Sequence, residues 1–151
     1  MAATIEDPLS IPQPFEEISH TADLIVGVEA NSKEVAIARL VLALGQLLSG
    51  RKQLSPTERS RVRVEAGDLA VMAVDVLREL LYAFSTKGVI PCKCGVALFD
   101  EEAGGDLMVD TAPYDETSHQ EGVDIKAVTF HRARFEECGD GRWEAEVTMD
   151  I

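Results

Sequence analysis

The sequence predicts a single α+β domain, in which a mainly antiparallel or mixed β-sheet packs on two helices in the order β-β-α-β-α-β-β-β-β. Two segments place apolar side chains at the i, i+3, i+4, i+7 spacing of an amphipathic helix. Most of the remaining chain alternates apolar and polar residues between turn signals, as strands do. The 151 residues suffice for one core. Residues 15–151 are therefore expected to form the domain, and the proline-containing residues 1–14 a flexible lead.

The first half of the chain predicts short strands around one helix. A polar corner, His20-Thr21-Ala22-Asp23, separates the first two strands. Asn31 and Glu34 have the spacing of a capping box, so a helix is expected from there to about Leu48, with Gly50 as its stop. The strands expected in this half are Phe15–Ser19, Leu24–Ala30 and Ser60–Ala66.

The second half predicts one helix followed by four strands. Asp68 can cap a helix that runs to about Ser85, before Gly88. The last two strands are expected to form a hairpin across Cys138-Gly139-Asp140-Gly141. The strands expected here are Val89–Phe99, Leu107–Thr111, Val123–Phe135 and Arg142–Ile151.

The final strand alternates without interruption to the end of the chain. Its polar face includes Asp150, and its apolar face is expected to end on Ile151, which would anchor the terminus. If the fold brings Asp23 to this point, three carboxylates converge, counting the terminal one. Such a cluster needs a hard cation or must take up protons. Calcium or magnesium would suit these oxygens better than zinc, whereas in the simpler alternative each aspartate is solvated or satisfies backbone donors.

The charge balance bears on the class of partner. Against 14 Lys and Arg stand 27 Asp and Glu, for a formal charge of −13. This argues against nucleic acid as the main partner, although it leaves room for a local basic patch. It favours cations or a basic protein surface, unless the charge serves only solubility. No segment reads as a membrane span or a signal peptide, so a cytoplasmic location is expected.

Cysteine and histidine residues offer one further metal hypothesis. The odd number of cysteines favours reduced thiols. Cys92 and Cys94 would share a strand face, and with Cys138 and His119 or His131 they could hold zinc. A single C-x-C is a weak signal, and buried structural thiols are the favoured interpretation.

Two other polar positions allow both a structural and a functional interpretation. Lys126 would be an edge charge of its strand, a counter-charge to the acidic cluster, or a phosphate contact. His131, five residues on, would point to the opposite face. The loop that carries Asp115 and His119 is either a site or a solvated connection.

No complete enzyme site is evident in the sequence. It has no glycine-rich phosphate loop, and no nucleophile can be matched to a base. A metal-dependent phosphoesterase that uses Asp23 and Asp150 is the enzyme function to consider. It would need a second metal or a general base.

Four segments together resemble the archease family, and the resemblance runs from Phe15 to Ile151. Their order and spacing also agree with that family. The segments are His20-Thr21-Ala22-Asp23, Leu77-Arg78-Glu79-Leu80-Leu81-Tyr82, Ile125-Lys126-Ala127-Val128-Thr129-Phe130-His131 and Asp150-Ile151.

The resemblance implies a cytoplasmic accessory protein of RNA processing rather than an enzyme. Archeases stimulate the GTP-dependent RNA ligase that seals tRNA exon halves, by promoting its guanylylation and turnover, and have been linked to a tRNA methyltransferase. Carried over by position, a divalent metal, calcium before magnesium, is expected on Asp23, Asp150 and Ile151. Lys126 would serve activation, and His20 would orient a neighbour or contact the partner. Neither stable nucleic-acid binding nor membrane association is expected.

Overall fold

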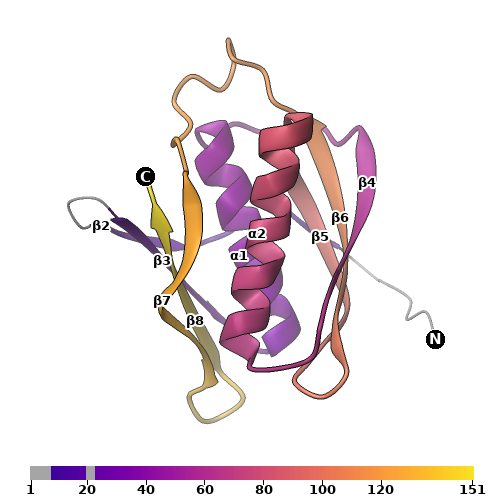
Figure 1. Ribbon diagram of the computed structural model, residues 1–151, viewed down its shortest axis with the longest axis vertical. Coiled ribbons are helices and arrows are strands. Elements are labelled where there is room, and N and C mark those ends of the chain that lie inside the picture. Colours follow the sequence, from indigo (N-terminus) through magenta and orange to yellow (C-terminus); the bar gives the residue numbers. More distant parts are fainter. Residues whose placement is uncertain (1–7, 20–22) are drawn as a thin grey trace.

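The computed structural model describes residues 8–19 and 23–151 and has three layers, with two helices between two antiparallel four-stranded sheets (Figure 1). Sheet A has the strand order β1-β5-β6-β4, and sheet B the order β2-β3-β8-β7. The elements are β1 Leu9–Ser10, β2 Glu16–Ser19, β3 Asp23–Ala30, α1 Lys33–Ser49, β4 Glu58–Val64, α2 Leu69–Lys87, β5 Val89–Asp100, β6 Gly104–Pro113, β7 Ala127–Glu137 and β8 Trp143–Asp150.

The predicted α+β class and the two helices are confirmed, and the structure adds two features. A two-residue strand, β1, lies within the expected lead and pairs with β5. The strands also divide into two sheets, because β3 near the start of the chain pairs with β8 at its end, while β4, β5 and β6 pair among themselves. A period of two gives the faces of a strand but does not name its partners.

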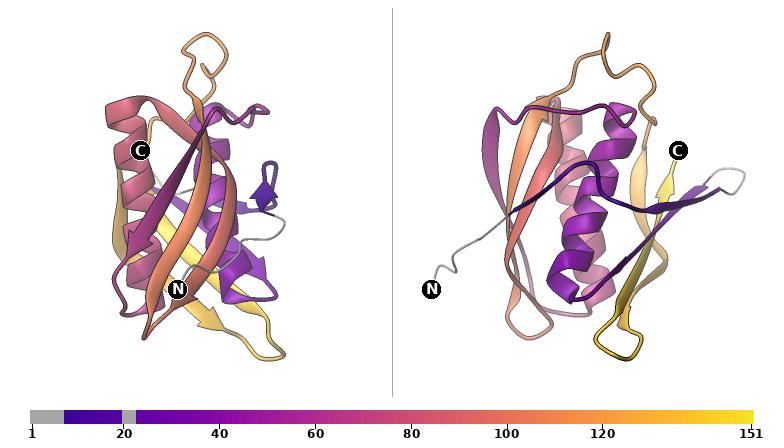
Figure 2. Two further views of the ribbon diagram at one scale, coloured as in Figure 1. Left: turned by 90° about the vertical axis from the view of Figure 1, so that its right-hand side faces the viewer. Right: turned by 180° about the vertical axis from the view of Figure 1, so that it is seen from behind.

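Each helix contacts strands of both sheets (Figure 2). Helix α1 packs on β3, β5 and β8, and it is buried around most of its circumference. Helix α2 packs on β4, β5 and β7 and keeps one exposed side, which carries Arg78 and Tyr82. The core therefore fills both interfaces between the helix layer and the sheets.

The helix ends follow the predicted capping chemistry with one correction. Ser32, not Asn31, is the N-cap of α1, because its hydroxyl accepts a hydrogen bond from the main-chain N–H of Val35 at 3.1 Å. Asp68 caps α2 as predicted, accepting from the N–H groups of the next turn. Gly50 and Gly88 end the two helices in the left-handed conformation that glycine adopts without strain.

One glycine sets the distance between α1 and sheet A. A Cβ on Gly45 would collide with the main-chain carbonyl oxygen of Pro91 in β5. This helix can approach β5 as closely as it does only because no side chain is present at that point. Among the described residues, neither helix is long and apolar enough to cross a membrane.

Candidate metal site at the end of the terminal strand

The antiparallel pairing of β3 with β8 brings Asp23 and Asp150 side by side. Eight consecutive residue pairs join the two strands without a register shift, from Asp23 opposite Asp150 to Ala30 opposite Trp143. Side chains directly opposite in such a pair have Cβ atoms about 4.5–5.5 Å apart and share a face. The first residue of β3 and the last of β8 therefore place two carboxylates together at one end of sheet B.

The buried face of β8 holds this end of the strand in place. Ala145, Val147 and Met149 are each at most 1% exposed and lie opposite apolar residues of β3. The predicted alternation is thus confirmed, and it directs Asp150 away from the core. Met149, beside buried Leu24, is the last anchor of the strand.

The expected role of Ile151 as an anchor is wrong. Its side chain is 42% exposed, and β8 ends at Asp150. The strand ends level with Asp23, the first residue of β3, and with Ala127, the first residue of β7. Ile151 therefore follows the end of the strand with its side chain exposed.

Lys126 lies beside this pair of aspartates but not within a strand. Its main-chain N–H donates to the carbonyl oxygen of Asp150 at 2.8 Å. The next residue, Ala127, pairs with Asp150 and opens β7. The prediction that the strand starts at Val123 is therefore wrong by four residues. The buried side chain of Ile125 holds the segment that leads into the strand against the core. The Lys126 side chain is exposed.

The donor chemistry of this end fits a hard divalent cation. No described residue forms an ion pair with Asp23 or Asp150, and like charges directly opposite in a sheet are destabilising. The carboxylate oxygens of Asp23 and Asp150 are ligands that calcium and magnesium accept. Within residues 8–19 and 23–151, no three His, Cys, Asp or Glu side chains form a metal-binding group. Protein side chains would thus supply only part of the coordination shell. His20, expected beside Asp23, lies outside the described residues.

Comparison with known proteins places this geometry in a family. The model of the archease protein family (MTH1598/TM1083) matches residues 15–151. The chain belongs to the archease family.

Relatives and a solved structure agree over nearly the whole length. The chain is 31% identical over 140 residues to protein archease of Methanopyrus kandleri, covering 91% of this chain and 99% of that one. It is 29% identical over 139 residues to protein archease of Thermococcus gammatolerans, covering 91% and 98%. The solution structure of Methanobacterium thermoautotrophicum protein 1598 superposes with a TM-score of 0.74 at 25% identity, covering 91% of this chain and 98% of that chain.

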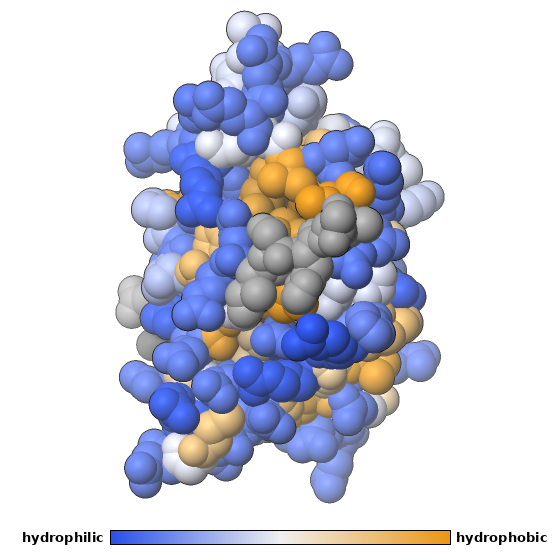
Figure 3. All heavy atoms as spheres, turned by 90° about the vertical axis from the view of Figure 1, so that its left-hand side faces the viewer, coloured by the Kyte–Doolittle hydropathy of each residue, from blue (hydrophilic) through white to orange (hydrophobic). Residues whose placement is uncertain are grey.

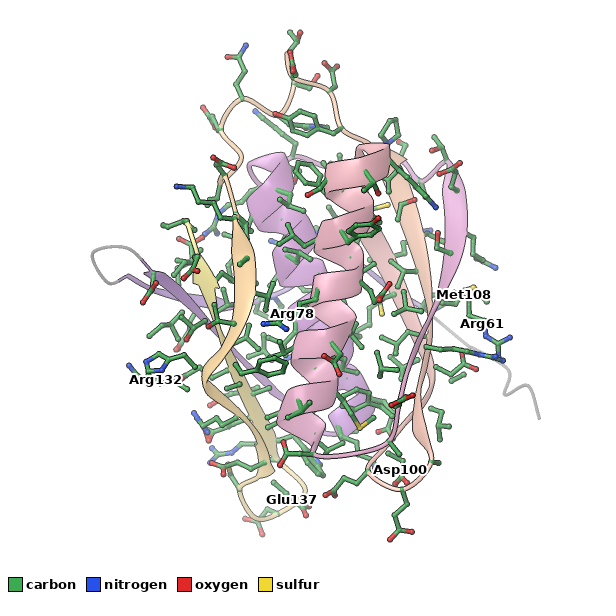
Figure 4. The ribbon with its side chains drawn as sticks, viewed as in Figure 1. Arg61, Arg78, Asp100, Met108, Arg132 and Glu137 are labelled. Atoms are coloured by element: carbon green, nitrogen blue, oxygen red, sulfur yellow. The ribbon has the colours of Figure 1, made fainter. Side chains whose placement is uncertain are left out.

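Two of the sequence segments that resembled archeases meet in space. Between Thr129 and Arg134, strand β7 bulges, with four residues opposite the single Val147 of β8. The bulge exposes Phe130, which is 45% accessible, and the Arg78 guanidinium from α2 lies 4.1 Å from the centre of its ring. Arg78 also donates to the carbonyl oxygen of Val128 at 2.8 Å (Figure 4). Helix α2 and the edge strand of this archease fold are therefore fastened at the bulge.

The bulge changes the expected position of His131. Strict alternation would direct His131 to the face of the strand opposite to that of Lys126. Lys126, however, precedes the strand, and the φ of 57° at Arg132 breaks the extended backbone next to His131. His131 is exposed within the bulge. A period-two reading could not locate it because extra residues on one strand break the period.

Hydrophilic residues predominate on the outer side of sheet B, where they surround an apolar patch (Figure 3). A hollow on this face brings together four glutamates and two arginines, Glu16, Glu29, Glu144, Glu146, Arg39 and Arg134. Arg134 bridges glutamates of both β7 and β8, the nearest at 3.0 Å. Acid thus exceeds base along the same face that ends in Asp23 and Asp150. The individual charges were evident from the sequence, but their gathering on one face depends on the pairing of β3 with β8.

In this archease-family chain, hydrogen bonds among its own residues hold the loop that carries Asp115 and His119. The ring Nδ1 of buried His119 accepts from the main-chain N–H of Asp115 at 2.9 Å. The Asp115 carboxylate accepts from the N–H of Thr117, which lowers the pKa of Asp115. These contacts close the loop on itself.

The cysteines do not form the zinc site considered from the sequence. Burial raises the pKa of Cys92 to about 11 and that of Cys94 to about 12, so both stay protonated at neutral pH. Within the described residues, the three cysteines do not come together with a histidine in a metal-binding group. Cys138 donates to the Glu144 carboxylate at 2.9 Å on the other sheet. Buried structural thiols, the favoured interpretation, fit Cys92 and Cys94.

Proposed function

We propose that this chain is an accessory protein of tRNA splicing or RNA repair that activates a GTP-dependent RNA ligase. It would promote guanylylation of the ligase and support repeated turnover. The observation that supports the proposal is the pairing of Asp23 with Asp150, which Ile151 follows directly. This arrangement fits a calcium site, with magnesium as the alternative.

The site is suited to sharing a cation with a partner. When bound, the cation would neutralise the carboxylates with its positive charge, and its remaining coordination positions would accept further oxygen ligands. Asp23 and Asp150 would hold it from one side only, because both lie on the outer face at the end of sheet B. Water or an oxygen of the ligase would fill the remaining positions, so modest affinity for the isolated chain is expected.

Lys126 would act from the adjoining turn. Its main-chain bond to Asp150 fixes the start of its side chain next to the acidic pair, while its ammonium group is free to reach outward. A lysine at this position can contact a phosphate or an acidic residue of the ligase. This contact would orient the site on the partner.

The acidic face of sheet B supports docking at a basic surface. A ligase that holds RNA and GTP needs positive charge around its active site. The glutamates of the hollow, farther along the same face than Asp23 and Asp150, complement such a surface and would steer encounter. Modulation of a tRNA methyltransferase remains a prediction from the family resemblance alone.

The experiment compares ligase activation with independent catalysis. Purified ligase is incubated with labelled GTP, with and without this chain, and guanylylated ligase is measured over several turnovers. In parallel, the isolated chain is offered phosphoester substrates with calcium, magnesium or manganese. We expect faster guanylylation and no phosphoester turnover. Phosphoester hydrolysis by the chain, without any effect on the ligase, would establish the rival enzyme function instead.

A further inference from the structure

A ladder of arginines occupies the outer face of sheet A, on the opposite side of the molecule from the acidic face. Strand β4 carries Arg59, Arg61 and Arg63 at alternate positions, and all three are exposed. Lys93 of β5 lies in the same row of the sheet as Arg59, across Asp110 of β6. Figure 4 shows Arg61 pointing away from the helices on this side.

Two of the arginines are held in place by carboxylates of β6. Arg59 binds Asp110 through two nitrogens, at 2.7 and 3.3 Å, and Arg61 binds Asp106 in the same way, at 2.8 and 2.5 Å. Their side chains remain 62% and 43% exposed. Because each guanidinium has five N–H donors, both keep donors directed at solvent. The ion pairs thus order the head groups without consuming them.

The ladder leaves an excess of positive charge. No ion pair involving Arg63 or Lys93 is formed within the described residues. Four cations therefore face the two carboxylates of β6, in a chain whose formal charge is −13. The net charge of the chain does not reveal this face, because most of the acidic residues that make the chain negative lie on other parts of the molecule.

The spacing of the ladder indicates what it binds. Alternate residues of a strand are about 6.6–6.8 Å apart, which is comparable to the separation of successive phosphates along a nucleic-acid strand. Guanidinium groups bind phosphate oxygens in a two-point geometry. Leu98, which is 39% exposed, and partly exposed Met108 lie on the same face and offer apolar contacts to sugars or bases.

We propose that the outer face of sheet A binds the phosphodiester backbone of a single RNA strand, independently of its sequence. An acidic protein segment is the other polyanion that could reach this face. The regular spacing and the use of arginine favour phosphates, because carboxylates on a peptide have no fixed repeat of that length. The helix layer separates this face from Asp23 and Asp150, so both surfaces can be occupied at once (Figure 1).

This inference goes beyond the proposed function and is tested without ligase or metal. Fluorescence anisotropy measures binding of the full chain to a labelled single-stranded RNA of about 12 nucleotides, a length within the range that single-strand-binding modules cover. With three to four phosphate contacts, log Kobs should fall with log salt at a slope of about −2 to −3. The triple variant Arg59→Gln/Arg61→Gln/Arg63→Gln should bind at least about tenfold more weakly at low salt.

A charge-matched control separates the ladder from net charge. The variant Lys87→Gln/Arg132→Gln/Arg142→Gln changes the charge equally but lies off this face, and it should bind like the parent. The double variant Arg63→Gln/Lys93→Gln breaks no recorded ion pair, so it remains informative if the triple variant fails to fold. It should lower the salt slope by about 1.4.

Three results would overturn the proposal. The first is an absence of RNA binding at low salt, and the second is equal loss of binding in the charge-matched control. The third is displacement of the RNA by poly-glutamate at an equal concentration of charges, which would assign the face to an acidic protein segment. A failure here leaves ligase activation untouched, because the assay contains neither the ligase nor a cation.

Discussion

Asp23 and Asp150 form a like-charged pair that the protein maintains at some cost. They lie directly opposite in an unbroken register, and no described residue neutralises them by an ion pair. A cation bound at the proposed site would relieve this repulsion, and it would stabilise the folded chain because it would bind only that state. The proposed site would thus link metal binding to stability.

Asp150→Asn should abolish stabilisation by calcium. At calcium concentrations about 100-fold above Kd, the parent should gain about 2.7 kcal/mol in unfolding free energy, measured by urea unfolding with and without calcium. The variant should gain almost nothing. Without calcium, it should be as stable as the parent or more stable by a few tenths of a kcal/mol, because one repelling charge is gone.

Glu29→Gln is the matched control for this experiment. Glu29 also lies on β3, opposite Glu144 of β8. Its substitution removes the same charge, but from the far end of the strand pair. It should retain the calcium response of the parent. If both variants lost the response equally, general acidity and not the Asp23–Asp150 pair would bind calcium.

At the scale of an element, α1 depends on a residue without a side chain. Alanine at a helix interior normally stabilises, but Gly45→Ala would drive a methyl group into the carbonyl of Pro91. We expect a loss of about 3 kcal/mol, the upper range for overpacking, measured as a lower urea midpoint. Gly67→Ala, where an added Cβ meets no atom within 4 Å, should change stability little. A neutral Gly45→Ala would show that α1 shifts freely against β5.

The pairing of β4 with β6 carries a pH-dependent contribution. A hydrogen bond from Arg61 lowers the pKa of Asp106 below its ordinary value of 3.8. A lowered pKa in the folded state means that the contribution is present above about pH 4 and is lost as the pH falls through the folded-state value. Arg61→Gln should therefore lower Tm at neutral pH, and its Tm should converge on that of the parent in acid. A difference that stays constant down to about pH 2 would contradict this linkage.

The sequence specified the local elements better than their partners. Asp68 begins and Gly88 ends α2 as predicted, because capping depends on residues close in the sequence. The cap of α1 lay one residue away, at Ser32, since Asn31 offers the same chemistry. The alternation of β8 correctly placed Asp150, but it extended the apolar face to Ile151, which follows the last residue pair of β3 with β8 and is exposed.

What could not be predicted depends on contacts between distant segments. Division into two sheets requires knowing that β3 pairs with β8. Nothing in the period of the sequence marks the start of β7 at Ala127 or the bulge that contains His131. The arginine ladder was visible as single residues, but its excess charge appears only when β5, β6 and β4 lie side by side.

At the scale of the whole molecule, charge is divided between two faces. The outer face of sheet B is acidic, whereas that of sheet A carries the arginine ladder. An acidic docking face predicts that activation of the ligase weakens with salt, mainly through a slower association rate measured by stopped-flow mixing. Between about 50 and 500 mM salt the Debye length shortens several-fold, so electrostatic attraction over a distance should weaken. An association rate that does not change over this range would count against electrostatic docking.

The most direct test measures multiple-turnover guanylylation of the ligase with the parent chain, Asp23→Asn and Glu29→Gln, each in calcium at a saturating chain concentration. Glu29→Gln removes a charge from the docking face, but at a saturating chain concentration the account predicts that it reaches the maximal activation of the parent. Asp23→Asn, in contrast, should lose at least about tenfold, the equivalent of 1.4 kcal/mol. Full activation by a correctly folded Asp23→Asn would contradict the claim that the paired aspartates serve the chemistry of another protein.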